Sequence, residues 1–237
     1  MSLALYNNIG GLRFLDEREI FLRDSWTQEI ARVVSTKLLN ANPAWKFHRV
    51  EGPLLTPREF INETYTDDDV WALKANLGES EAVLRPETTP SSYTYARHQM
   101  KSNKLAQPPV CFWQLGKSFR RETSDGANPA KMRYYEFYQL EFQCIYKADS
   151  KADYRNYVME PLCNLISYLT ACEARIVESD RLPAYSLSTM DIEAKVGRRW
   201  IEMCSMSIRK DFHPDMLVFE VAVGMDRLVA ALLWTKN

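Results

Sequence analysis

Arginines on both sides of a polar loop, in the middle of the chain, form a pattern that can bind a phosphorylated ligand. The run Phe119-Arg120-Arg121-Glu122 precedes the loop, and Arg133 and Phe137 follow it. Strand, long turn with Gly and Pro, and strand predict a β-hairpin. A guanidinium on a rigid strand holds a phosphate through its planar fork, and a nearby aromatic ring can stack on a base. Taken alone, a solvated hairpin with surface charges explains the pattern equally well.

A second arginine pattern lies near the end of the chain. An apolar run that begins at Glu220 reaches Gly224 and continues into a strongly apolar segment that contains Arg227. This predicts a strand, a glycine turn and a helix with the arginine in its first turn. The helix dipole disfavours a cation there by a few tenths of a kcal/mol to about 1 kcal/mol, so the arginine indicates an anion such as a terminal phosphate. An exposed arginine extending from a core helix is the alternative interpretation.

Composition excludes several classes of protein. The chain has 237 residues, 46% of them apolar, with 30 basic and 31 acidic side chains and a net charge of -1, as in an ordinary globular protein. Any nucleic-acid contact must therefore come from a local patch, such as the six Lys or Arg residues without a carboxylate between Arg97 and Arg121. The five cysteines and three histidines are scattered, which argues against a Cys/His metal site. The sequence has no signal-peptide pattern and no apolar run of membrane-spanning length, so a cytoplasmic enzyme is expected.

The elements that must position the two arginine patterns indicate an α+β fold. Apolar spacing predicts helices at residues 16–40, 91–100, 161–172 and from Asp226 to the end, with Pro161 in a first turn. Short apolar runs predict strands at residues 47–50, 82–84, 110–115, 137–146, 187–195, 200–205 and 217–223. Consecutive strands with helices around them predict an antiparallel β-sheet flanked by helices. No repeat or linker interrupts the chain, so one domain over residues 1–237 is expected.

The two arginine patterns together resemble motifs 2 and 3 of the class II aminoacyl-tRNA synthetases. The first is similar to the family's Phe-Arg-x-Glu, loop and Arg…Phe strand, and the second to its Gly-x-x-x-Arg helix. The run Val50-Glu51-Gly52-Pro53-Leu54-Leu55 is similar to motif 1, whose proline lies at the dimer interface in that family. All three occur in the family's order. The resemblance implies a class II catalytic domain that forms a homodimer through the region of Pro53.

Within the class, the chain most resembles the glycyl-tRNA synthetases. Leu84-Arg85-Pro86-Glu87-Thr88 is similar to a segment whose glutamate meets the substrate amino group in that family, and Asp191-x-Glu193-x-Lys195 with Glu202 is also similar. The segment from Cys204 to Phe212 is instead reminiscent of the seryl enzymes. One departure concerns Ala222, which stands where the glycyl family has a serine that contacts the substrate. Despite this departure, the resemblance as a whole ranks glycine first among the amino acids.

The resemblance implies that ATP binds between the two arginine patterns. Arg120 and Arg227 would be catalytic and hold the α- and γ-phosphates, and Arg133 would contact the triphosphate tail. Phe137 would stack on adenine, and Glu122 would hydrogen-bond near the adenine amino group.

The resemblance also assigns acidic residues around the amino acid. Glu202, together with Glu220, would hold Mg²⁺, which prefers carboxylate oxygens. Glu87 and Glu141 would bind the substrate ammonium, and Arg209 and Glu220 would complete the amino-acid site. The implied activity is attack of the amino-acid carboxylate on ATP to form an aminoacyl-adenylate, followed by acyl transfer.

Three functions stay open from the sequence. The first is an enzyme that charges a tRNA. The second is an activating enzyme that loads another acceptor, such as a carrier protein or a protein lysine, and the absence of room for an anticodon-binding domain after Arg227 favours it. The third is a non-catalytic dimeric binding or regulatory subunit with the same fold. Retention of Arg120, Arg133 and Arg227 favours the two catalytic functions.

Overall fold

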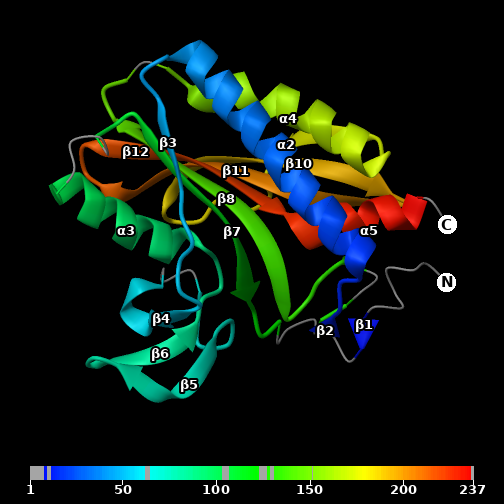
Figure 1. Cartoon of the computed structure of the whole chain (residues 1–237), viewed down its shortest axis with the longest axis horizontal. Coiled ribbons are helices and arrows are strands. Elements are labelled where there is room, and N and C mark those ends of the chain that lie inside the picture. Colours follow the sequence, from blue (N-terminus) through cyan, green and yellow to red (C-terminus); the bar gives the residue numbers. More distant parts are fainter. Residues whose placement is uncertain are drawn as a thin grey trace.

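Seven strands form one mixed sheet, called here the main sheet, and five of the ten predicted site residues lie on its strands (Figure 1). The computed structural model describes residues 8–9, 12–61, 65–102, 107–122, 127–128, 131–150 and 152–235. The strands lie in the order β3 (Lys46–Arg49), β7 (Val110–Phe119), β8 (Glu136–Lys147), β12 (Met216–Gly224), β11 (Arg199–His213), β10 (Ser186–Val196) and β9 (Ala174–Glu178). The predicted α+β class and the mostly antiparallel sheet are confirmed.

One pair in the main sheet departs from the antiparallel prediction, because β3 runs parallel to β7. The reason lies in their connection. The chain between Arg49 and Val110 passes through a second sheet and a helix before it returns. A connection of that length can reverse the chain direction twice, as a parallel pair requires.

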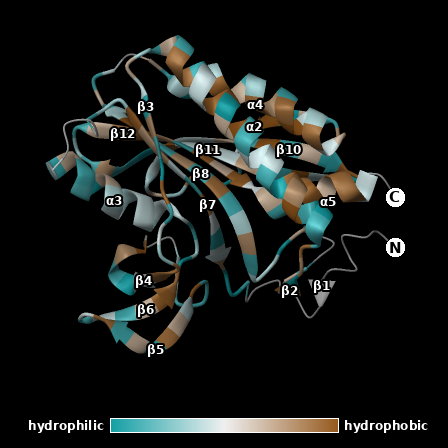
Figure 2. Ribbon diagram, viewed as in Figure 1, coloured by the Kyte–Doolittle hydropathy of each residue, from teal (hydrophilic) through white to brown (hydrophobic). Residues whose placement is uncertain are grey.

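Three helices cover one face of the main sheet: α2 (Glu17–Ala41), α4 (Tyr154–Thr170) and α5 (Met225–Thr235) (Figure 1). Their apolar stripes pack on Leu140, Phe142 and Val221, and all three of these residues are buried. The apolar residues concentrate along the strands and α5 (Figure 2). The fourth helix, α3 (Thr89–Ser102), packs on the opposite face through Tyr93. None of the helices in the described part of the chain is long and apolar enough to cross a membrane.

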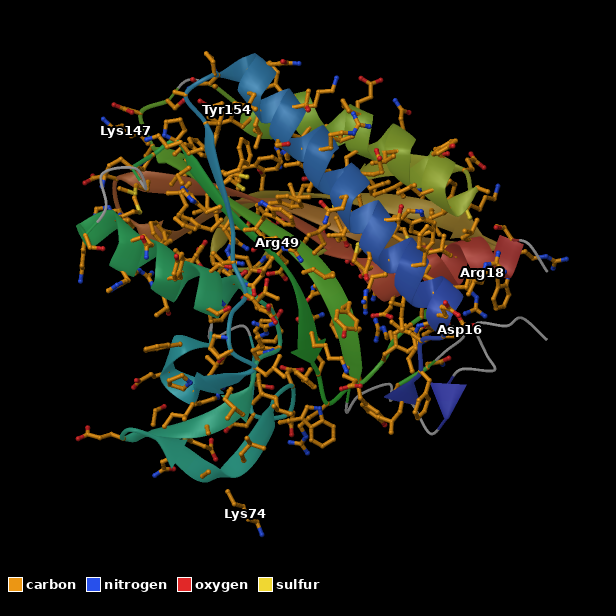
Figure 3. All side chains as sticks on the ribbon, in the orientation of Figure 1. Asp16, Arg18, Arg49, Lys74, Lys147 and Tyr154 are labelled. Carbon is orange, nitrogen blue, oxygen red and sulfur yellow. The ribbon has the colours of Figure 1, made fainter. Side chains whose placement is uncertain are left out.

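The ends of two helices follow local signals in the sequence. Asp16, labelled in Figure 3, caps α2, because its side chain accepts a hydrogen bond at 2.9 Å from the backbone N–H of Glu19. The prediction that Pro161 lies in a first turn is wrong. Helix α4 begins earlier, where Asp153 accepts a hydrogen bond from the N–H of Arg155, and Pro161 lies inside it. A proline is tolerated there at the cost of one backbone hydrogen bond.

A small antiparallel sheet lies beside the main sheet and consists of β4 (Leu55–Pro57), β6 (Ser80–Leu84) and β5 (Trp71–Leu77), in that order (Figure 1). The prediction contained only part of β6. Strand β5 lacks apolar alternation because nearly all of its side chains are exposed, including Lys74, which projects away from the molecule (Figure 3). The remaining short elements are β1 (Asn8–Ile9), β2 (Leu12–Arg13) and the 3₁₀ helix η1 (Arg58–Phe60). Five strands were not predicted from the sequence, namely β1, β2, β4, β5 and the edge strand β9.

Arg85 fixes the segment that leads to Glu87. Its buried guanidinium donates to the backbone carbonyl oxygens of Lys117 at 2.9 Å, Gly52 at 3.0 Å and Pro53 at 3.1 Å. Gly116 makes room for it, because a Cβ atom at that position would lie 2.2 Å from Nη2 of Arg85. One side chain thus joins the predicted motif 1 segment, β7 and the loop that holds Glu87.

Candidate active site

Strand alternation gives the main sheet one apolar face and one polar face. On β8, Leu140 and Phe142 belong to the core, while Gln139 and Glu141 point to the opposite face and line a cavity. This cavity has a volume of about 400 Å³. Strands β10, β11 and β12, the segment directly after β7 and the start of α5 also contribute to it. It is lined by every predicted site residue except one, namely by Glu87, Arg120, Glu122, Arg133, Phe137, Glu141, Glu202, Glu220 and Arg227.

Arg120 lies at the end of β7, where the backbone and one tyrosine hold it. Its Nε donates to the carbonyl oxygen of Pro86 at 3.2 Å, and Nη2 donates to the Tyr65 hydroxyl oxygen at 3.1 Å. Its guanidinium carbon also lies 5.2 Å from the centroid of the Phe137 ring. The guanidinium is thus oriented before any ligand binds, which is what positioning of a phosphate requires.

Arg227 reaches the same cavity from the first turn of α5, as predicted. Its Nε donates to the carbonyl oxygen of Met132 at 3.2 Å, and Nη1 donates to the carbonyl oxygen of Glu202 at 2.9 Å. Arg133 contributes a third guanidinium, 3.8 Å from a carboxylate oxygen of Glu122. The predicted hairpin is confirmed, because β7 and β8 pair from Val110–Ile145 to Phe119–Glu136. Part of its loop, residues 123–126 and 129–130, lies outside the described residues.

Three carboxylates gather at the deep end of the cavity. Glu141 accepts hydrogen bonds from the Thr88 hydroxyl at 2.6 Å and the Thr88 N–H at 3.1 Å. Glu220 accepts from the Thr89 hydroxyl at 3.0 Å, and Glu87 accepts from the Tyr65 hydroxyl at 3.0 Å. A buried group with more carboxylates than cations is suited to an ammonium group.

Arg209 is the cation that partly balances these carboxylates. Its guanidinium is fully buried and donates to Glu220 at 2.6 Å and to Asp211 at 2.7 Å, and it lies 3.8 Å from Glu87. Arg209 was predicted to bind the amino acid directly, and the structure places it outside the residues that line the cavity. It lies behind the three carboxylates of Glu87, Glu141 and Glu220, called here the acidic wall, and holds Glu220 in place.

Strand register separates Glu202 from Glu220, the two residues predicted to hold one metal ion. On β11, Glu202 pairs with Glu193 of β10, whereas Glu220 lies opposite Ser207, five residues further along β11. Five strand residues span about 16 Å, so the two carboxylates occupy opposite ends of the cavity. In the described ranges no three His, Cys, Asp or Glu side chains are grouped as metal ligands. Glu202 alone stays a predicted Mg²⁺ ligand.

Burial changes the protonation of the acidic wall. Desolvation, together with the charges of Glu220 and Glu87, raises the pKa of Glu141 to about 7. Desolvation also raises the pKa of Glu87, although the nearby charge of Arg209 acts in the opposite direction. Glu141 therefore changes its charge near neutral pH.

We expect this titration to make stability depend on pH. The pKa of Glu141 lies above the ordinary value of 4.5, so the folded protein keeps a proton that the unfolded chain releases. The free energy of unfolding therefore falls as pH rises from about 4.5 to about 7, by on the order of 3 kcal/mol, and stays lower above that window. Glu141→Gln should remove this decline, as measured by urea unfolding between pH 4 and pH 8. Parallel pH profiles of the variant and the wild type would contradict the assignment of this pH dependence to Glu141.

Several residues of the cavity were not predicted. Tyr65 and Tyr185 come from segments outside the main sheet strands, and Asp191, Ser205 and Ser207 come from β10 and β11. The alternation of polar and apolar residues from Cys204 to Arg209 was a usable signal, because it places both serines on one face. The two tyrosines carried no such signal.

Comparison with known proteins gives partial sequence matches and nearly complete structural ones. No family model matches the chain. Glycine–tRNA ligases of Lysinibacillus sphaericus and Staphylococcus aureus are each 31% identical to it over 137 residues, or 56% of the chain. That match spans 29% of each ligase, so the chain corresponds to less than a third of these relatives.

Solved prolyl-tRNA synthetase structures resemble the chain over almost its whole length. The Cryptosporidium parvum enzyme with halofuginone and AMPPNP gives a TM-score of 0.72 at 13% identity, and covers 95% of this chain and 48% of its own. The Giardia lamblia enzyme with prolyl-adenylate gives a TM-score of 0.70 at 14% identity, and covers 94% of this chain and 48% of its own.

The chain has the fold of class II aminoacyl-tRNA synthetase catalytic domains. Within that class, its sequence is distantly related to the glycine–tRNA ligases.

Proposed function

We propose that the protein activates an amino acid with ATP and forms an aminoacyl-adenylate. The observation that supports this most is the convergence of Arg120, Arg133 and Arg227 on one cavity whose other end is acidic. Guanidinium groups suit a triphosphate and carboxylates suit an ammonium. The prolyl-tRNA synthetases of similar fold were solved with AMPPNP, AMP or prolyl-adenylate, which supports an adenine nucleotide as ligand.

The proposed reaction needs no side-chain nucleophile. An oxygen of the ionised substrate carboxylate forms a bond to the α-phosphorus of ATP, the bond to the β-phosphate oxygen breaks, and pyrophosphate leaves. Arg120 holds the α-phosphate, Arg133 the triphosphate tail and Arg227 the γ-phosphate, while Phe137 stacks on adenine beside Glu122. Catalysis then consists of positioning and of neutralising charge on the phosphate oxygens.

Mg²⁺ fits this site through one carboxylate. The Glu202 side chain is half exposed and lies 3.4 Å from Nη1 of Arg227, the guanidinium assigned to the terminal phosphate. Mg²⁺ is commonly held by one or two carboxylates with phosphates and several waters, so Glu202 alone is sufficient on the protein side. The ion would neutralise phosphate charge during pyrophosphate release.

The acceptor and the amino acid belong to the same proposal. The relation to glycine–tRNA ligases favours transfer to the end of a tRNA in the cytoplasm, with glycine as the amino acid that sequence resemblance ranks first. ATP–pyrophosphate exchange with each of the twenty amino acids tests activation and identifies the substrate. Addition of bulk tRNA then separates charging of tRNA from loading of another acceptor. If no amino acid stimulates exchange, the catalytic proposal fails.

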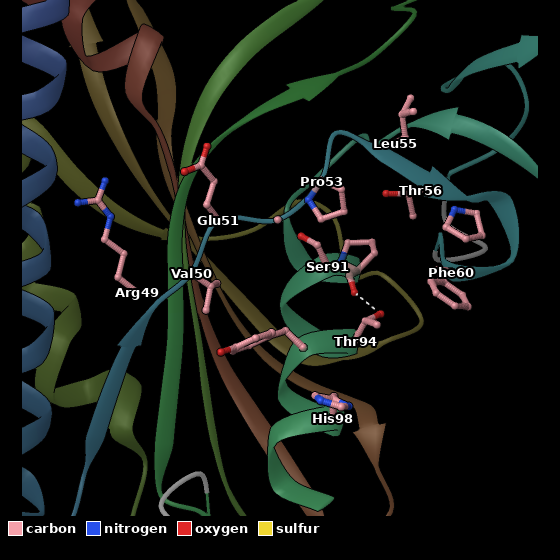
Figure 4. Close-up of a pocket in the computed structure, with 14 residues that line it drawn as sticks. Arg49, Val50, Glu51, Pro53, Leu55, Thr56, Phe60, Ser91, Thr94 and His98 are labelled. Atoms are coloured by element: carbon pink, nitrogen blue, oxygen red, sulfur yellow. Dashed lines mark hydrogen bonds between the residues drawn. The ribbon is translucent and has the colours of Figure 1, made fainter. Parts of the chain in front are cut away.

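We also propose that the chain forms a homodimer through the groove at Pro53, shown in Figure 4. This groove of about 640 Å³ runs between the predicted motif 1 segment and α3. Leu55, Phe60 and Tyr95 line it, and 42%, 48% and 44% of their surfaces are exposed. Three large apolar side chains in one groove indicate a protein contact. The occupant we propose is a second copy, as the motif 1 resemblance implies.

Phe60→Asp should weaken this dimer about 100-fold or more, because it places an unpaired carboxylate in the contact. Sedimentation equilibrium of the wild type and the variant measures the change. Phe21→Asp is the matched control, because Phe21 is 69% exposed on α2, outside the groove. A wild type that stays monomeric, or equal dissociation of both variants, would refute the interface.

A further inference from the structure

One row of side chains crosses the cavity from the acidic wall to β10. Strand register places Glu141 of β8 opposite Ala222 of β12, Ala222 opposite Ser205 of β11, and Ser205 opposite Asp191 of β10. All four of these residues line the cavity. The row therefore has a carboxylate at each end and two small side chains between them.

The middle of this row leaves room next to the proposed ammonium site. Neighbouring strands lie about 4.8 Å apart, so the backbones of β8 and β10 are separated by about 14 Å. Ala222 and Ser205 fill little of that width. A site specific for glycine would have to fill the space beside the ammonium, since glycine has no side chain to occupy it. The row is shaped instead for a substrate side chain of several atoms.

Asp191 supplies a hydrogen-bond acceptor at the far end of the row. Only 7% of its surface is exposed, and its carboxylate is hydrogen-bonded to the side chains of Ser179 and Ser205. Its Oδ1 atom is buried and has no hydrogen-bond partner among the residues that the structure describes. A buried acceptor without a partner is destabilising, and more so when it is charged, so such an atom indicates a missing donor.

Charges around Asp191 favour a basic or neutral donor over an acidic one. Glu202 and Asp180 both act on the Asp191 carboxylate and, together with burial, raise its pKa. The hydroxyl groups of Ser207 and Thr189, which lie next to the row and line the cavity, add polar contacts but no charge. An acidic or apolar side chain would gain nothing there.

We propose that this row is the side-chain subsite of the substrate, with Asp191 as the residue that determines specificity. The substrate is then an amino acid whose side chain ends in an N–H or O–H donor, with a basic or amide side chain the best match, rather than glycine. This inference rests on the proposed activation of an amino acid and names its substrate class. Asp191 accepts the donor hydrogen bond while Glu87, Glu141 and Glu220 hold the ammonium.

Two measurements on the wild type test the class of substrate. ATP–pyrophosphate exchange and the thermal shift in unfolding temperature are each recorded with all twenty amino acids, the second in the presence of AMPPNP. We expect a donor side chain to give both responses. A response to glycine alone would overturn the subsite but leave amino-acid activation standing. Thermal shifts without exchange would support the subsite and refute the catalytic proposal. No response in either measurement overturns both.

Asp191→Asn tests the residue itself. The KM of the active amino acid should rise about 10- to 100-fold, because the charged acceptor of the hydrogen bond is replaced by a neutral amide oxygen, while the KM of ATP stays unchanged. Glu193→Gln is the matched control, since Glu193 lies on the same strand and pairs with Arg175 outside the cavity. Unfolding of each variant in urea checks the fold. A rise in the KM of ATP instead would assign Asp191 to the nucleotide and overturn the proposal.

A second variant tests the space rather than the charge. Ala222→Val adds two methyl groups in the middle of the row and leaves both carboxylates in place. We expect it to reduce exchange with the long-side-chain substrate more than the binding of ATP. If both variants leave the preference among amino acids unchanged, the row does not contact the side chain.

Discussion

ATP–pyrophosphate exchange should fall about 100- to 1,000-fold when Arg120 is replaced by alanine, because one preorganised charge at the α-phosphate is lost. The structure gives this expectation a geometric basis. Hydrogen bonds to Pro86 and Tyr65 and the ring of Phe137 hold the guanidinium at the cavity. Exchange is measured at saturating amino acid, so that the loss appears in the rate rather than in substrate affinity.

Arg121→Ala is the matched control for Arg120→Ala. Arg121 is the next residue in the chain, but its Nη1 donates to the carbonyl oxygen of Asp67, and it does not line the cavity. We expect little change in exchange from this variant. Equal losses in both variants would indicate a general effect of the hairpin, and unchanged exchange in Arg120→Ala would remove Arg120 from the reaction.

The second large effect concerns stability. Arg209→Met should lower the free energy of unfolding by about 3–5 kcal/mol, because it leaves buried carboxylates without their cation. Burial of a guanidinium is costly in itself, but Glu220, Asp211 and Glu87 together offset that cost here. Their charges raise the pKa of Arg209 even though desolvation lowers it. Urea unfolding measures the loss.

Two further variants separate the buried charge from ordinary packing. Arg209→Met combined with Glu220→Gln should recover part of the lost stability, because it removes the strongest uncompensated charge. Arg175→Ala breaks a partly exposed pair with Glu193 at 2.7 Å and should cost less than about 1 kcal/mol. A double variant as unstable as the single one would mean that lost packing, and not charge, explains the effect.

Local signals in the sequence predicted single elements, whereas relations between distant residues depend on the fold. The two arginine patterns were predicted from the sequence because each occupies one local element, a hairpin or the start of a helix. Their convergence could only be inferred from resemblance, because about a hundred residues separate Arg120 from Arg227. The cavity that both line is a product of the antiparallel pairing of β8 with β12.

The sequence left the roles of some charged residues and the edge strands undecided. From the sequence, Arg209 could either face a ligand or form a buried ion pair. Residue spacing does not distinguish these two positions, because its acidic partners Glu87 and Glu220 come from different parts of the chain. Strand β5 was missed because an exposed edge strand needs no apolar alternation. Strand β3 was expected in an antiparallel sheet, but it runs parallel to β7. The direction of β3 depends on the connection of 60 residues to β7 rather than on the sequence of the strand itself.

The sequence by itself determined the α+β class, the order of the helices and most main-sheet strands, and the two local arginine patterns. These follow from periodicity and residue type, which act over a few neighbouring residues. Only the tertiary structure decided which side chains share the cavity and that Arg209 lies behind its acidic wall. It also decided that Glu141 and Asp191 lie at the two ends of one row of side chains across the sheet. Strand register sets these relations, and register depends on packing between segments far apart in the chain.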